Sequence, residues 1–248
     1  ERNKIKYVIG DIHGQIDKLQ KLIGLVDSDD GEFIFIGDYI DKGRNSKEVV
    51  EYLIELAGRR KCIFLVGNHE YAWNSYLTGS KRYIDFLLQY GGIQFLESYL
   101  GREIDSEDAR ALLIEGTFVT NIFPKKHKFF LRQTLPYYEL KEYTCVHAGI
   151  NPLYEKKDLC EHNVEDMVFV RQEFINSRFL FIGKRIIFGH TAFERPYVDS
   201  YKIGIDTGAV YSHDAALTAI NLDEMCFITH KGGCFSAKEY SCPEILPI

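Results

Sequence analysis

The sequence predicts an α/β fold built around a sheet whose first strands are parallel. Three observations lead to this prediction. Short apolar runs alternate with amphipathic stretches in the first third of the chain, a polar turn with glycine follows each run, and 14% of the residues are aromatic. Strands that alternate with helices form parallel sheets with right-handed crossovers, and aromatic residues favour strands. The 248 residues are enough for a domain with a large core.

The first third is expected to run strand, helix, strand, helix, strand. Residues 6–9, 32–36 and 61–66 are the predicted strands, because each is a short apolar run. Residues 46–56 form a predicted helix that begins at Ser46. Residues 15–26 form the other predicted helix, since apolar side chains recur there every three or four positions, at Ile16, Leu19, Leu22, Ile23 and Val26.

The middle of the chain, residues 71–132, is predicted to be a helical insertion with helices at 84–90, 93–100 and 108–123. The basic run at residues 125–128 is expected to be a solvated loop. Aromatic residues recur at helical spacing and are expected in the core of this layer rather than on a surface that stacks bases; they are Tyr83, Phe86, Tyr90, Phe95 and Tyr99.

The remainder is expected to be mostly β structure. One helix is predicted at residues 164–175, among strands at 137–146, 185–188, 203–206, 215–222 and 225–230. No internal repeat, low-complexity tract or linker divides the sequence. We therefore expect a single domain over residues 1–248.

Charge and cysteine spacing argue against several classes of protein. A net charge of −6 is unlike that of proteins that coat nucleic acid. No apolar run approaches the length of about 20 residues that spans a membrane, and the first residues do not read as a signal peptide. None of the six cysteines forms a C-x-x-C pair, which argues against a zinc ribbon or a thioredoxin-type site. A reducing, cytoplasmic setting is the prediction.

Chemically informative residues follow the predicted strands directly. The carboxyl ends of parallel strands share one edge of a sheet, and ligands bind there. Five distant segments are therefore expected to converge on one site. They read GDIHG at 10–14, GDYIDKG at 37–43, GNHE at 67–70, HAG at 147–149 and GHT at 189–191.

Aspartate, asparagine and histidine at these turns form a candidate metal set. Oxygen and imidazole ligands together suit Mn, Fe or Zn rather than Ca or Mg alone. Six ligands exceed the needs of one tetrahedral ion and suit two metals about 3.5–4 Å apart. Asp38 follows the second predicted strand, which comes between the strand before Asp11 and the strand before Asn68. It is therefore the natural carboxylate to bridge the two metals. The candidate ligands are Asp11, His13, Asp38, Asn68, His147 and His190.

The order of these turns resembles the motif order of the calcineurin-like metallophosphoesterases. Within that superfamily the chain looks like the phosphoprotein phosphatase branch, which includes bacterial and phage Ser/Thr phosphatases. A further match at residues 205–209 extends the resemblance over residues 10–209. The resemblance implies a metallophosphatase-type β-sandwich of mixed sheets flanked by helices, in which residues 71–132 are a helical cap insertion.

The resemblance also assigns roles to the metal ligands. The ions would be manganese, with iron or zinc as alternatives, and they would lower the pKa of a bridging water, whose hydroxide attacks phosphorus in line. By position, the first metal would be held by Asp11 and His13, the bridge would be Asp38, and the second metal would be held by Asn68, His147 and His190.

Further residues are assigned to acid catalysis and to phosphate binding. In the resembled family the histidine of GNHE protonates the leaving group, which makes His69 the expected general acid and Asp41 its orienting carboxylate. The family usually has arginine where this chain has Lys42, and lysine cannot make the planar bidentate contact of arginine. Arg44 is the alternative clamp on that side, and Arg171 fits the second arginine position of the family.

The leading functional hypothesis is a phosphomonoester hydrolase of the Ser/Thr protein phosphatase type, acting on a phosphorylated protein or a small phosphoester. Asp41 favours it over a symmetrical dinucleoside polyphosphate hydrolase, such as a diadenosine tetraphosphatase, because those enzymes tend to lack the second aspartate. GNHE rather than GNHD argues weakly against an RNA-end phosphatase or cyclic phosphodiesterase. A non-catalytic binding protein with the phosphatase fold would be expected to have lost ligands, and here all six are present.

Overall fold

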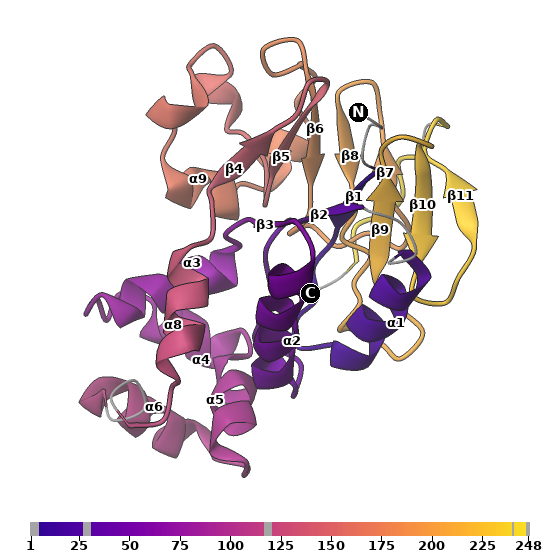
Figure 1. The fold of residues 1–248 in the computed structure, drawn as a ribbon. Helices are drawn as coiled ribbons and strands as arrows, with labels where there is room; N and C mark the ends of the chain where they lie inside the picture. The colour runs from indigo at the N-terminus through magenta and orange to yellow at the C-terminus, as the bar shows by residue number, and fades with distance from the viewer. Residues whose placement is uncertain (1–4, 27–30, 117–120, 240, 247–248) are drawn as a thin grey trace.

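The computed structural model describes residues 5–26, 31–116, 121–239 and 241–246. Two sheets lie face to face, and a block of helices extends from one side of them (Figure 1). Among the described residues, no helix has both the length and the apolar character needed to cross a membrane.

The first sheet has six strands in the order β11-β10-β9-β1-β2-β3. β1, β2 and β3 are parallel, as predicted, with Val8 opposite Ile34 and Ile34 opposite Ile63. β9, β10 and β11 continue the sheet in antiparallel fashion from β1. The strands are β1 (Lys6–Ile9), β2 (Glu32–Phe35), β3 (Cys62–Phe64), β9 (Thr218–Asn221), β10 (Cys226–Thr229) and β11 (Cys234–Ser236).

The second sheet has five strands in the order β4-β5-β6-β8-β7, and its three central strands are parallel. The apolar side chains between the sheets form one buried cluster, in which Val8 and Ile34 of the first sheet join Ile187 and Ile203 of the second. The predicted sandwich of mixed sheets is therefore confirmed. The strands are β4 (Tyr137–Glu139), β5 (Tyr143–Val146), β6 (Arg185–Phe188), β7 (Tyr197–Val198) and β8 (Lys202–Gly204).

Helices cover the outer faces of both sheets. The apolar faces of α1 (Ile16–Val26) and α2 (Ser46–Arg59) share a buried cluster with Ile9 and Phe33 of the first sheet. Met167 and Phe174, from α9 (Val164–Phe169) and α10 (Gln172–Ile175), pack with Phe188 of the second sheet. The single helix predicted at residues 164–175 is wrong, because Val170 is extended and Arg171 leaves the helical region with φ −134° and ψ −93°.

Helices form where the helical insertion is predicted, and their apolar side chains share the buried cluster of the first sheet. The helix predicted at 108–123 instead spans Ser106–Glu115, because Asp105 caps its start and Gly116 ends it with φ +72°; residues 117–120 lie outside the described part. The insertion comprises α3 (Asn68–Leu77), α4 (Ile84–Gln89), α5 (Gly92–Leu100), α6 (Ser106–Glu115) and α8 (Lys125–Arg132).

Two expectations for the insertion need correction. The basic run at 125–128 begins α8 rather than a solvated loop, and His127 is buried there beside the Tyr99 hydroxyl at 2.8 Å. The aromatic series divides in two. Tyr83, Phe95 and Tyr99 lie in the core as predicted, whereas Phe86 is only partly buried and Tyr90 is 45% exposed.

Candidate active site

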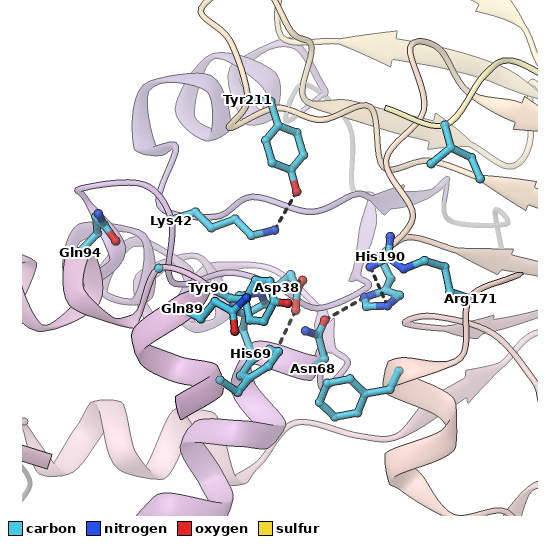
Figure 2. A pocket seen from close by; sticks show the side chains of 14 residues that line it. Asp38, Lys42, Asn68, His69, Gln89, Tyr90, Gln94, Arg171, His190 and Tyr211 are labelled. Atoms are coloured by element: carbon cyan, nitrogen blue, oxygen red, sulfur yellow. Dashed lines mark hydrogen bonds and ion pairs between the residues drawn. The ribbon is translucent and has the colours of Figure 1, made fainter. Parts of the chain in front are cut away.

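The polar turns predicted to converge do so at the carboxyl-terminal ends of the central strands. Residues that follow β1, β2 and β3 meet residues that follow β5 and β6 of the opposite sheet. Figure 2 shows three of them, Asp38, Asn68 and His190, gathered at the cleft. Asn68 and His69 begin α3, immediately after Gly67. The structure brings together all six candidate ligands and His69, which are buried with at most 9% exposure.

Asp38 lies at the centre of the group, and its two carboxylate oxygens face different neighbours. Oδ2 is 3.3 Å from His13 Nε2 and 3.9 Å from His69 Nε2. Oδ1 is 3.4 Å from His147 Nε2. Two sets of ligand atoms result, each within 4.8 Å of one another: His13, Asp38 and His69, and Asp38, His147 and His190. A carboxylate common to two sets is what a bridged dinuclear site requires.

Backbone carbonyls fix the orientation of two of the imidazoles. His13 Nδ1 donates to Ile40 O at 2.9 Å, and His147 Nδ1 donates to Ile36 O at 2.8 Å. A donor role for Nδ1 leaves the lone pair on Nε2, so both rings direct that lone pair at the Asp38 carboxylate. Metal-binding histidines in proteins are oriented by such hydrogen bonds.

The second set is completed by Asn68. Its Oδ1 lies 3.1 Å from His147 Nε2 and 2.9 Å from His190 Nδ1. His147 Nε2 thus faces two oxygen acceptors, Asn68 Oδ1 and Asp38 Oδ1, and a cation or a proton must lie between them. Burial opposes protonation, but the Asp38 charge raises the pKa of His147 above its ordinary value. Imidazole, carboxylate and amide oxygen gathered in one group are nevertheless the ligand types that a divalent transition metal takes.

Asp11 supplies a second argument for a cation. Its Oδ2 accepts a hydrogen bond from the His190 backbone N–H at 3.0 Å, while its buried Oδ1 has no hydrogen-bond partner among the described residues. Burial, followed by the charges of Asp206 and Asp38, raises the pKa of Asp11 well above its usual value. A carboxylate in this position needs a positive partner, since a buried acceptor without a donor is costly.

His69 and Asp41 form a buried pair. His69 Nδ1 is 2.7 Å from Asp41 Oδ2, and the other Asp41 oxygen accepts from Trp73 Nε1 at 2.8 Å. The carboxylate is therefore placed to orient the imidazole. Burial is the main cause that raises the pKa of Asp41 to about 7 and lowers the pKa of His69 to about 3. At neutral pH the His69 ring is therefore uncharged, and the Asp41 carboxyl is only partly ionised.

Strained backbone is concentrated at this site. Among the described residues, seven other than glycine have positive φ, and five of them are His13, Asp38, Asp41, Lys42 and His190. Such conformations cost of order 1–3 kcal/mol each and persist where the surrounding structure enforces them. A Cβ on Gly67 would overlap the carboxylate of Asp38. Glycine is thus needed at this turn to leave room for the carboxylate.

Sequence reasoning missed the role of Glu70. Its buried carboxylate accepts from the backbone N–H groups of Asp38 at 2.7 Å, Tyr39 at 2.9 Å and Gly67 at 3.0 Å. Glu70 therefore joins the turn after β2 to the turn after β3. The available signal was its position as the third residue of a helix, where a glutamate side chain can accept from the N–H of the N-cap residue, as Glu70 does from Gly67.

Two cationic side chains reach the site from opposite sides of Asp38 (Figure 2). Lys42 Nζ is 3.0 Å from His13 Nε2 and donates to the Tyr211 hydroxyl at 2.9 Å. Arg171, in the break between α9 and α10, donates from Nη2 to His190 Nε2 at 3.1 Å. Arg44 is not brought to the site. Its side chain is 79% exposed and lies 3.5 Å from Glu103.

An open cleft of about 810 Å³ lies over the buried polar group. The helical insertion and α9 supply one aromatic wall, in which Phe86 lies 5.4 Å from the His69 ring, 4.9 Å from Tyr90 and 5.6 Å from Phe169, centroid to centroid. Besides the residues already described, the cleft is lined by Phe86, Gln89, Tyr90, Gly91, Gln94, Phe169 and Ile245.

Comparisons with known proteins agree with this geometry. A model of the calcineurin-like phosphoesterase family matches residues 7–217. The chain is 28% identical over 251 residues to an asymmetrical bis(5'-nucleosyl)-tetraphosphatase, PrpE, of Oceanobacillus iheyensis, covering 90% of both chains. A cold-active protein-tyrosine phosphatase of Shewanella has a similar fold (TM-score 0.64, 17% identity, 95% of this chain and 80% of that one). So has a serine/threonine phosphatase of Saccharomyces cerevisiae (TM-score 0.53, 14% identity, 98% and 83%).

Proposed function

The chain belongs to the calcineurin-like phosphoesterase family, and we propose that it is a dinuclear metal enzyme that hydrolyses dinucleoside polyphosphates. The observation that carries the proposal is a buried two-metal ligand set at the bottom of a cleft with an aromatic wall. Asp11, His13 and Asp38 would hold one metal. Asp38, Asn68, His147 and His190 would hold the other.

Two divalent metals supply Lewis acidity and activate water at neutral pH. Imidazole, carboxylate and amide ligands together favour manganese, with iron and zinc as the alternatives. The presence of every candidate ligand in one buried group also supports catalysis over a non-catalytic binding protein.

His69 is the proposed proton donor to the leaving oxygen. It lies beside Asp38 and lines the cleft, and Asp41 fixes the orientation of its ring from the buried side. Because the pKa of Asp41 is raised to about 7, a protonated Asp41 can donate to Nδ1, which leaves the proton of a neutral His69 on Nε2, where it can pass to the leaving group. Asp41 acts through His69 and is a positioning residue.

Lys42 and Arg171 are the proposed phosphate contacts. They line the cleft on opposite sides of Asp38, so a phosphate chain lying across the site would meet a cation at each end. Arg171 can contact two phosphate oxygens at once, whereas Lys42 offers a single ammonium held by Tyr211.

The substrate class rests on the cleft and on the relatives. Phe86, Tyr90 and Phe169 present aromatic surface beside the metal ligands, and bases stack on such side chains. The PrpE relative, which matches over nearly the whole chain, is described as asymmetrical. We therefore propose cleavage of a dinucleoside tetraphosphate into unequal products, in place of the symmetrical cleavage considered from the sequence.

A phosphoprotein phosphatase is the second candidate. The observation in its favour is the Asp41–His69 pair, whose aspartate distinguishes the protein phosphatases from the symmetrical hydrolases in the motif comparison. The open cleft admits a phosphorylated side chain on an extended segment. A small phosphomonoester is accommodated by the same groups.

Equal amounts of Mn²⁺-loaded enzyme on diadenosine tetraphosphate and on a phosphoserine peptide test the proposal. We expect faster turnover of the nucleotide, with ATP and AMP as products. ADP as the sole product would establish symmetrical cleavage instead. Faster release of phosphate from the peptide would favour the second candidate, and no turnover of either with Mn²⁺, Fe²⁺ or Zn²⁺ would refute both.

A further inference from the structure

A group of sulfur and oxygen donors lies on the β10–β11 hairpin, at the opposite edge of the six-stranded sheet from β3 (Figure 1). One donor atom from each of Glu224, Cys226 and Cys234 lies within 4.8 Å of the other two. Cys226 Sγ is 3.7 Å from Glu224 Oε2. Both cysteines are free thiols. The phosphoesterase chemistry uses none of these groups.

Strand register brings the two thiols together. Cys226 is opposite Ser236, and Ile228 is opposite Cys234, so both cysteines lie on the same face of the hairpin as diagonal neighbours. Cys226 is buried with 5% exposure, whereas Cys234 is exposed and can adjust its position.

A tight turn before β10 adds the carboxylate. The side chain of Asn221 accepts from the Glu224 backbone N–H at 3.1 Å, and Met225 has a left-handed φ of 54°. The Met225 carbonyl accepts from the Ala237 N–H at 2.8 Å, beyond the end of β11. The backbone that carries Glu224 and Cys226 is thus fixed against the strand that carries Cys234.

We propose that Glu224, Cys226 and Cys234 bind a zinc ion, with water as the fourth ligand. Tetrahedral zinc with Zn–S near 2.3 Å and Zn–O near 2.1 Å places its ligand atoms about 3.5–3.8 Å apart. The Cys226–Glu224 separation of 3.7 Å matches that spacing. Binding removes the proton from each thiol and releases both to solvent, so the ion is held by two thiolates and one carboxylate.

The donor types separate this site from the phosphoesterase site. Thiolates select zinc over manganese, while the histidine, aspartate and asparagine set accepts manganese. The ion would join β10 to β11, a short strand whose residues are all exposed. It would thereby secure the edge of the sheet.

Cobalt is a suitable probe, because Co²⁺ replaces Zn²⁺ and thiolate ligands give it a strong near-ultraviolet charge-transfer band. The candidate ligands of the phosphoesterase site include no cysteine, so the band does not arise at that site. We expect reduced full-length protein with Co²⁺ to show the band and one equivalent of Zn²⁺ to remove it. This outcome is independent of the proposed function, since Asp38→Asn should keep the band.

Three variants decide the assignment. Cys234→Ser, at an exposed position, should lose the band without loss of the fold, and Cys226→Ser should lose it also. Cys160→Ser is the matched control at another exposed cysteine and should keep it. Absence of the band in reduced wild-type protein, or its persistence in Cys234→Ser, would overturn the proposal. Formation of a Cys226–Cys234 disulfide by atmospheric oxygen at the same rate with and without one equivalent of Zn²⁺ would overturn it as well.

Discussion

The floor and the rim of the cleft differ in how they are built. The floor consists of the six candidate ligands and His69, which follow strands of both sheets and are buried. The rim consists of Phe86, Gln89, Tyr90, Gln94 and Phe169, which belong to the helical insertion and α9. Floor side chains are held by buried hydrogen bonds, whereas Tyr90 on the rim is 45% exposed.

This difference separates the residues expected to carry out hydrolysis from those expected to select the substrate. The floor holds its side chains through strained backbone and fixed ring orientations, which suit groups that must keep a precise geometry. The rim offers aromatic and amide surface that can change without disturbing the ligands. We therefore expect floor variants to abolish turnover of every substrate, and rim variants to change the preference between substrates.

The largest effect is expected for Asp38→Asn on the floor. The substitution removes the charge that both sets of ligands share, so turnover of all substrates should fall to the background rate. Phosphate release from p-nitrophenyl phosphate measures the loss of turnover, and circular dichroism verifies that the variant is folded. Glu103→Gln, the same change at an exposed position, is the control and should keep full activity. Retained turnover in folded Asp38→Asn would show that this carboxylate is not essential.

His69→Asn should lower kcat by about two to four orders of magnitude, the range typical of lost acid catalysis. The metals should remain bound, because the proposed ligand set does not include His69. Metal analysis of the purified variant, beside its kcat, distinguishes the two roles. Loss of a metal in this variant would make His69 a ligand, which its place near His13 and Asp38 also allows.

Lys42→Ala should lower kcat/KM by about tenfold to a hundredfold, since a hydrogen bond to a charged group contributes about 1.5–3 kcal/mol. Arg44→Ala is the matched control and should have no effect, because Arg44 points to solvent beside Glu103. Steady-state kinetics on one phosphate substrate measure both variants. The reverse ranking would mean that Arg44 turns into the cleft when substrate binds.

The smallest effect is expected on the rim. Tyr90→Ala should raise KM for diadenosine tetraphosphate about fivefold to tenfold, the lower end of what a base gains by stacking on an aromatic ring. Its KM for p-nitrophenyl phosphate should stay unchanged. Phe129→Ala, at an exposed aromatic residue of α8 outside the cleft, is the control. Equal effects on both substrates would argue against a base-binding rim.

The floor was predictable from the sequence because its residues follow apolar strands directly, and the parallel order of β1, β2 and β3 fixes where those strands end. The rim was not, since the same helical spacing describes Phe95 in the core and Phe86 in the cleft. The choice between Lys42 and Arg44 depends on left-handed backbone at Asp41 and Lys42, which residue type alone does not reveal.

The number of Mn²⁺ ions bound per chain tests the central claim, that Asp38 joins two metal sites. Wild-type protein should bind two ions, and its electron paramagnetic resonance spectrum should show exchange coupling between ions bridged at about 3.5–4 Å. Cys234→Ser should give the same result, because the hairpin thiols do not favour manganese. A single ion per chain with an uncoupled spectrum would contradict the claim.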